Sequence, residues 1–293
     1  MTITILDGGM GRELRQIGAP FAQPEWSALS LIEAPEMVGQ AHQNFIDAGA
    51  QVITTNTYAL VPFHIGQERF ETRGFELAEM AAKIAKEKAR QANVKVAGSL
   101  PPAFGSYRPD LFEKNTFESI LTPLIDAQED HVDLWIIETA ASVIEANSIV
   151  DLIKNKSNKP IWIAFTLENR DNYDQPSQLR SKEPLDQALK SFAFAHVVDA
   201  ILYNCSQPEE MEDAIKTTKS IYPNIKTGAF ANSFSETKRS HAANEGVSSE
   251  RDDITPDKYL DFAKSWVDAG ATIIGGCCGI GPKHIRKLAG FFN

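Results

Sequence analysis

Short apolar runs alternate with longer amphipathic segments along the whole sequence, and this alternation limits the possible folds more than any other feature. The apolar runs predict strands at residues 2–7, 52–58, 94–100, 134–139, 160–167, 200–205, 225–232 and 272–276. The runs are continuously apolar, which is typical of parallel strands that are covered on both faces.

An amphipathic segment follows each run and carries helical periodicity. These segments predict helices at residues 35–48, 74–92, 116–131, 143–155, 184–195, 208–221, 255–269 and 282–291. Eight β/α units without a linker or a composition shift indicate one α/β domain over residues 1–293. We therefore expect a (β/α)8 TIM barrel with eight parallel strands. An open doubly wound sheet is the alternative, but no GxGxxG motif follows the first run.

The three cysteines follow two of the predicted strands. Cys205 closes one run, and Cys277 and Cys278 follow another run between glycines. Strand ends meet at one rim of a barrel, so three thiolates could converge there, and three protein ligands with one open position are typical of catalytic zinc. Two observations keep a structural reading open. Cysteine often serves as a small core residue, and neighbours on a regular strand point in opposite directions, unless the glycines bend the chain.

Polar residues end several other runs and would share the same rim. Asp7 ends the first run, Thr55 and Tyr58 lie in the second, Glu138 is in the fourth, and Asn232 ends the seventh. Each residue alone could be a cap or a loop residue. Their occurrence together with the cysteines indicates one shared pocket.

Composition and charge exclude several classes of function. The net charge is −10 and no basic cluster is present, so we expect neither nucleic-acid nor membrane partners. The first residues do not resemble a signal peptide, and no apolar run approaches the roughly 20 residues of a membrane span. An odd number of cysteines, three, does not suggest a disulfide framework and favours a reducing cytoplasm.

Other chemical motifs are missing or ambiguous. The six histidines lack zinc-site spacing, and neither a Ser/His/Asp arrangement nor a phosphate-binding loop is visible. Residues 233–253 form the longest connection without apolar periodicity, and a connection of that length is either a lid or a simple surface loop.

Four motifs in order resemble the homocysteine S-methyltransferase family over essentially the whole chain. They lie at residues 6–14, 47–58, 204–205 and 275–279. The resemblance implies a zinc-dependent barrel that methylates L-homocysteine to methionine. It implies that Cys205, Cys277 and Cys278 hold Zn²⁺, and that the metal rather than a catalytic side chain activates the substrate thiol.

The resemblance also implies roles for substrate-binding residues. Asp7 and Glu138 match the positions that hold the homocysteine amino group, and Trp26 matches an aromatic near the methyl donor. We expect Tyr58 to offer a second aromatic face to a sulfonium cation, and Thr55 and Asn232 to line the same pocket.

Two departures from the family pattern favour one branch. Thr139 stands where the betaine-using branch has a tyrosine, and that branch's tetramer-forming C-terminal extension is missing. No folate- or cobalamin-binding module is present either. These absences favour the stand-alone branch that uses S-methylmethionine or S-adenosylmethionine, as a monomer or small homo-oligomer.

Several alternatives stay open at this stage. The same barrel could methylate another thiol or a selenol such as selenohomocysteine, or could use betaine. A lyase could use Asp7 and Glu138 as acid and base. A non-catalytic zinc or redox-sensing module would use the cysteines without a substrate pocket.

Overall fold

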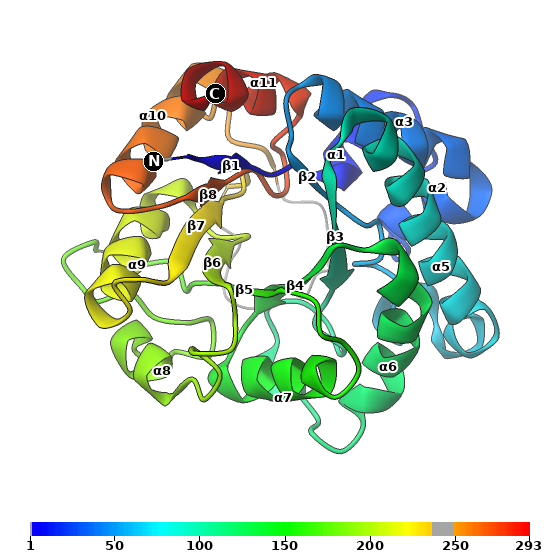
Figure 1. Cartoon of the computed structure of the whole chain (residues 1–293), viewed down its shortest axis with the longest axis horizontal. Helices are drawn as coiled ribbons and strands as arrows, with labels where there is room; N and C mark the ends of the chain where they lie inside the picture. Colours follow the sequence, from blue (N-terminus) through cyan, green and yellow to red (C-terminus); the bar gives the residue numbers. More distant parts are fainter. Residues whose placement is uncertain (1, 171, 236–248) are drawn as a thin grey trace.

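The computed structural model describes residues 2–170, 172–235 and 249–293, and Figure 1 shows a ring of strands surrounded by helices. Eight strands in this part of the chain form one sheet of parallel pairs, in the order β1-β8-β7-β6-β5-β4-β3-β2. The strands are β1 (Thr4–Ile5), β2 (Val52–Thr54), β3 (Lys95–Leu100), β4 (Leu134–Ala140), β5 (Ile161–Phe165), β6 (Ala200–Asn204), β7 (Lys226–Phe230) and β8 (Ile273–Ile274).

A short parallel bridge between Leu6 and Val52 closes the ring beside β1 and β2. The backbone N–H of Asp7 donates to the carbonyl of Val52 at 3.0 Å, and Gln51 N–H donates to the carbonyl of Ile5 at 2.8 Å. The sheet therefore has no open edge, and the predicted TIM barrel is confirmed.

Helices cover the outside of the barrel (Figure 1). The helices that follow the strands as predicted are α3 (Pro35–Asp47), α5 (Gln67–Ala92), α6 (Phe117–Gln128), α7 (Val143–Lys154), α8 (Leu185–Ser191), α9 (Pro208–Ile221), α10 (Pro256–Asp268) and α11 (Pro282–Phe292). The sequence analysis did not predict α1 (Met10–Gln16), α2 (Ser27–Glu33), α4 (Pro62–Ile65) or the 3₁₀ turn η1 (Pro109–Leu111). The end of the helix predicted at residues 116–131 is a 3₁₀ turn, η2 (Glu129–His131).

The predicted strand at residues 52–58 is wrong beyond Thr54. Side-chain and local hydrogen bonds replace the sheet ladder there: Thr57 N–H donates to the carbonyl of Thr55 at 2.9 Å, and the Thr57 hydroxyl donates to the carbonyl of Ser99 at 2.8 Å. Threonine favours such local bonds because its hydroxyl competes with the backbone ladder. The first and last strands are likewise shorter than predicted, with two residues each.

Two apolar clusters form the core. An inner cluster fills the barrel and includes Leu6, Leu134, Ile136, Leu202 and Phe230, while a larger outer cluster joins the strands to the helices. Burial on both faces explains why the strands are apolar throughout.

The alternation of side chains along a strand aims polar residues at the barrel mouth. In β4, Leu134 and Ile136 belong to the inner cluster, while Trp135 and Ile137 belong to the outer one. Because side chains alternate with a period of two, Glu138 is the next inward residue on β4. The carboxyl ends of barrel strands therefore collect inward polar side chains, and this end is where barrel enzymes place their sites.

No helix in the described parts of the chain is long and apolar enough to cross a membrane. The connection at residues 233–253 lies partly outside the described residues. Its two described ends pair with each other, because Ser235 N–H donates to the carbonyl of Ser249 at 2.9 Å. The lid prediction for this connection stays a prediction.

Candidate metal and substrate site

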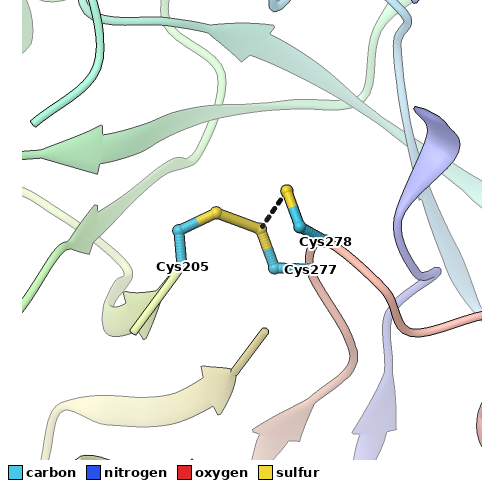
Figure 2. A group of neighbouring side chains, drawn as sticks. All are labelled: Cys205, Cys277 and Cys278. Atoms are coloured by element: carbon cyan, nitrogen blue, oxygen red, sulfur yellow. Dashed lines mark hydrogen bonds between the residues drawn. A yellow bond between two sulfur atoms is a disulfide. The ribbon is translucent and has the colours of Figure 1, made fainter. Parts of the chain in front are cut away.

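The three cysteine sulfurs converge at the mouth of the barrel (Figure 2). Cys205 directly follows β6, and Cys277 and Cys278 follow β8 after two glycines. All three Sγ atoms lie within 4.8 Å of one another. The bend after β8 therefore removes the objection that neighbouring cysteines on a strand diverge.

Gly9 and Gly279 allow the chain to pack tightly beside this bend. A Cβ added to Gly9 would lie 2.5 Å from the carbonyl oxygen of Cys277. Gly279 has a φ of +81°, and a side chain there would also collide with the Ser233 hydroxyl. Because neither glycine has a side chain, neighbouring backbone segments can approach closely beside the cysteines.

Cys205 and Cys277 form a disulfide, which the sequence analysis did not predict. Their Cα atoms are 5.7 Å apart, within the range for such a bond. Cys278 is free, and its Sγ lies 3.9 Å from that of Cys277 (Figure 2). Three thiolates become available only after the disulfide is reduced.

The donor set fits a metal once it is reduced. A tetrahedral site with Zn–S bonds near 2.3 Å separates its sulfurs by roughly 3.8 Å, similar to the observed 3.9 Å between Cys277 and Cys278. Burial, and to a smaller extent the charge of Glu138, raises the pKa of the Cys278 thiol to about 11. A thiol in this environment needs a nearby cation to lose its proton at neutral pH.

Two buried carboxyl groups lie in the same cavity as the cysteines. Asp7 accepts hydrogen bonds from the backbone N–H of Thr54 at 2.7 Å and from its hydroxyl at 3.0 Å. Glu138 accepts a 2.5 Å hydrogen bond from the hydroxyl of Ser99 on the neighbouring strand β3. Hydrogen bonds from an adjacent strand thus fix the orientation of each carboxyl group.

Burial also sets the charge of these carboxyl groups. Desolvation raises the pKa of Asp7, the Thr54 hydrogen bonds lower it and the charge of Glu138 raises it, so that the pKa is about 7. Desolvation likewise raises the pKa of Glu138 to about 7, opposed by the Ser99 hydrogen bond. A bound ammonium group would favour the ionised forms of both, because opposite charges lower a carboxyl pKa.

Aromatic side chains form part of the cavity wall. Trp26 packs edge-on against Phe21 with ring centroids 5.8 Å apart. The hydroxyl of Tyr58 is hydrogen bonded to the Ser106 hydroxyl at 2.6 Å. The structure therefore brings Trp26 and Tyr58 to the cavity where they were expected.

Thr55 and Asn232 also line this cavity, but their side chains have internal partners. The Thr55 hydroxyl donates to Oε1 of Gln128 at 2.7 Å. Asn232 Oδ1 accepts from the backbone N–H of Phe234 at 3.3 Å. Their substrate-binding roles stay predictions.

The cavity has a volume of about 660 Å³. That lies within the range of roughly 300–1,000 Å³ for small-molecule sites. Its wall includes two residues that the sequence analysis missed, Tyr107 and Arg180. They lie in the connections after β3 and β5, and no motif marks them. Both connections follow the carboxyl ends of strands, where barrel enzymes place their sites, and this position is the signal that could have identified the two residues.

Backbone strain gathers at the cavity. Six described residues other than glycine have positive φ, and four of these line the cavity: Trp26, Tyr107, Thr139 and Cys205. Such conformations are costly for side chains with a Cβ and persist where surrounding contacts enforce them, often at functional sites.

The fold and this cavity define a TIM-barrel enzyme with a cysteine cluster and two buried carboxyl groups at the carboxyl ends of its strands. The chain belongs to the homocysteine S-methyltransferase family, whose sequence profile matches residues 4–292. It is therefore a methyltransferase.

Individual relatives agree with this assignment. The homocysteine S-methyltransferase of Escherichia coli (strain K12) is 28% identical over 316 residues, covering 98% of this chain and 94% of that protein. The selenocysteine methyltransferase of Astragalus bisulcatus is 24% identical over 330 residues, covering 97% and 90%. The solved metallated form of the homocysteine methyltransferase MmuM from Escherichia coli is similar with a TM-score of 0.79 at 25% identity, covering 99% and 96%.

Proposed function

We propose that this protein transfers a methyl group from a sulfonium donor, S-methylmethionine or S-adenosylmethionine, to the sulfur of L-homocysteine. The observation that carries the proposal is the convergence of three cysteines and two buried carboxyl groups on one cavity. The products are methionine and the donor's neutral thioether. We also propose a cytoplasmic location, because a reducing compartment keeps the cysteines available as thiolates.

Cys205, Cys277 and Cys278 would hold one Zn²⁺ ion. Bound zinc would supply a positive charge that lowers the pKa of a coordinated substrate thiol, so that it is a thiolate at neutral pH. The remaining chemistry needs no acid. The homocysteine sulfur attacks the methyl carbon, a new C–S bond forms, and the old C–S⁺ bond breaks with its electron pair on the leaving sulfur.

Asp7 and Glu138 would bind the ammonium group of homocysteine and fix its orientation. A buried cation is costly unless carboxylates pair with it, and both carboxyl groups are held by neighbouring strands. Trp26 and Tyr58 would face the sulfonium cation of the donor, which an aromatic face attracts by about 0.5–2 kcal/mol. Holding the two sulfurs and the methyl in line is the main catalytic task.

Betaine is the weaker donor candidate. Thr139 occupies the position of the tyrosine in the betaine-using branch, and its own contacts use both its backbone and its side chain. Its N–H donates to Asn204 Oδ1 at 3.0 Å, and its hydroxyl accepts from Asn204 Nδ2 at 3.0 Å. A side chain fixed in this way does not extend toward the cysteines as a longer tyrosine could.

Two alternatives have a specific observation in their favour. The similarity to a selenocysteine methyltransferase favours a selenol acceptor as the second candidate. The Cys205–Cys277 disulfide favours a redox-sensing role, but such a role gives no reason for the two carboxyl groups in the cavity.

The test is methionine formation by reduced, zinc-loaded protein with homocysteine and one donor at a time. We expect S-methylmethionine to react best, S-adenosylmethionine more slowly, and betaine and methyltetrahydrofolate negligibly. Selenohomocysteine and selenocysteine are then compared as acceptors. A preference for betaine would overturn the donor assignment, and the absence of methyl transfer to any thiol or selenol would leave the redox role.

A further inference from the structure

Arg180 places a cationic side chain in the cavity, on the connection between β5 and α8. Two antiparallel bridges shape this connection, between Leu167 and Leu179 and between Gln178 and Pro184. The backbone N–H of Arg180 donates to the carbonyl of Thr166 at 3.0 Å. The Arg180 side chain is 9% exposed and lines the cavity.

The guanidinium of Arg180 forms a buried ion pair with Glu168 and contacts the Tyr107 ring. Its Nη1 lies 3.6 Å from Glu168 Oε1, beyond hydrogen-bond distance, and no hydrogen bond from the guanidinium to a described residue is found. Arg170 on the same connection differs, because its guanidinium donates to Glu210 Oε2 at 2.6 Å and to the Gln175 carbonyl at 2.7 Å. Arg180 therefore retains donors for an anionic ligand in the cavity.

The Tyr107 ring packs against the Arg180 guanidinium. The Arg180 Cζ atom lies 5.3 Å from the centroid of the Tyr107 ring. Burial raises the pKa of Tyr107, the charge of Cys278 raises it further, and the charge of Arg180 lowers it. Tyr107 thus contacts Arg180 through its ring and lines the same cavity as the cysteines.

The barrel separates this cation from one of the proposed ammonium ligands. In the closed strand order, β5 is four strands away from β1 in either direction, so Arg180 and Asp7 enter the mouth from opposite sides. Glu138 lies on β4, the neighbour of β5, so this separation from Arg180 holds for Asp7 alone. A guanidinium across the mouth from Asp7 can take the carboxylate of a second amino-acid ligand that meets homocysteine at the cysteines.

We propose that Arg180 binds the α-carboxylate of the methyl donor, so that the site selects sulfonium ions that are also amino acids. This inference rests on the proposed function. A guanidinium can hold a carboxylate through two parallel hydrogen bonds, which fixes both position and orientation. A short aliphatic chain joins that carboxylate to the sulfonium, which would then face Trp26 and Tyr58 near the cysteines.

The first experiment compares donors on the unaltered, reduced and zinc-loaded protein. S-methylmethionine and its carboxamide carry the same sulfonium and ammonium groups and differ in the negative charge. We expect the carboxamide to have a KM about 10- to 100-fold higher, the usual cost of losing a hydrogen bond between charged groups. Equal KM values for the two donors would overturn the proposal.

The second experiment uses Arg180→Met, with Arg180→Lys as the charge-retaining variant. We expect Arg180→Met to raise the S-methylmethionine KM by about 10- to 100-fold, Arg180→Lys to raise it less, and both to leave the homocysteine KM unchanged. For the carboxamide donor, the Met variant should differ little from the unaltered protein. Arg73→Met is the matched control, since Arg73 pairs with Glu76 on the surface of α5 and should not alter either KM.

Calorimetric binding of S-methylmethionine to the zinc-loaded protein, without homocysteine, gives a readout independent of turnover. A weaker Kd for Arg180→Met supports the proposal. A raised homocysteine KM with an unchanged donor KM would instead assign Arg180 to the other substrate. If the unaltered protein neither binds nor consumes any sulfonium donor, the proposed function fails as well; if it does both and Arg180 has no effect, this inference alone fails.

Discussion

Thr54 binds both oxygens of Asp7, with its backbone N–H 2.7 Å from Oδ2 and its hydroxyl 3.0 Å from Oδ1. The end of β2 thereby orients the carboxyl group that follows β1. These bonds favour the ionised form of Asp7, against the desolvation that raises its pKa to about 7.

Removing the Thr54 hydroxyl should weaken homocysteine binding without removing the carboxyl group. Thr54→Val keeps the shape and the backbone bond, and the lost hydrogen bond is worth about 0.5–1.5 kcal/mol. We expect the homocysteine KM to rise roughly 2- to 10-fold, with Thr54→Ser close to the unaltered protein. An unchanged homocysteine KM in Thr54→Val would show that this hydroxyl does not contribute to substrate binding.

Ammonium binding should depend on pH through Asp7 and Glu138. Both have a raised pKa of about 7, so both are ionised above that value and lose their charge below it. The Kd of L-norleucine, which has the ammonium group of homocysteine but no thiol, should be constant near pH 8 and weaken severalfold by about pH 6. Calorimetry measures this directly.

Substitution of these carboxyl groups provides the control for that pH effect. Asp7→Asn and Glu138→Gln should each weaken norleucine binding by about 10-fold or more at pH 8 and flatten the pH dependence. Zinc content should stay near that of the unaltered protein. Loss of zinc in either variant would show that the residue supports the metal site instead.

Metal binding should require reduction of the Cys205–Cys277 disulfide. After treatment with a reductant and dialysis against zinc, we expect about one zinc per chain, and much less without the reductant. Serine at any of the three cysteine positions should lower the zinc content strongly, as elemental analysis can measure. Full methyl transfer by reduced protein stripped of metal would contradict the zinc proposal.

The barrel could be predicted from the sequence because the apolar pattern of each strand is a local property of the chain. Strands buried on both faces must be apolar along their whole length, and the runs around Ile136 and Leu202 show this directly. The short helices α1, α2 and α4 contain seven residues or fewer, too few for a clear helical period. The helix α8 is equally short and was found only within a longer predicted segment at residues 184–195.

The site was predictable where side chains sit at strand ends. Glu138 follows from the alternation along β4, and the cysteines from their place after β6 and β8. Arg180 and Tyr107 could not be predicted in this way, because the shape of a long connection decides where they point. The disulfide depends on the oxidation state of the cysteines, which the sequence does not determine.

His42 should make the protein sensitive to acid. It is fully buried in α3, neither ring nitrogen has a hydrogen-bond partner in the described residues, and burial together with the charge of Lys88 lowers its pKa to about 4. The unfolded chain binds a proton at His42 below its ordinary pKa of about 6.5, so this contribution to stability is present above that pH and is lost toward pH 4.

Comparison of the protein with His42→Leu isolates this effect. The raised pKa values of Asp7, Glu138 and Glu145 act in the opposite direction, so the informative quantity is the difference in unfolding free energy between the two proteins. From pH 7 to pH 5 we expect that difference to shift by about 2 kcal/mol in favour of the leucine variant. His196→Leu, at an exposed position, should not produce this shift in urea unfolding.

Trp26 should contribute to donor binding through the positive charge of the sulfonium. Its indole lines the cavity on a residue with a φ of +51°, so its backbone is held in a conformation that a mere loop residue rarely needs. Trp26→Ala should raise the S-methylmethionine KM by roughly 3- to 30-fold, the equivalent of about 0.5–2 kcal/mol, and Trp26→Phe by less. Methionine has the same chain with a neutral thioether, so its Kd separates cation binding from simple packing. An equal loss for methionine and S-methylmethionine would reduce Trp26 to a packing residue, and an unchanged donor KM would remove it from the mechanism.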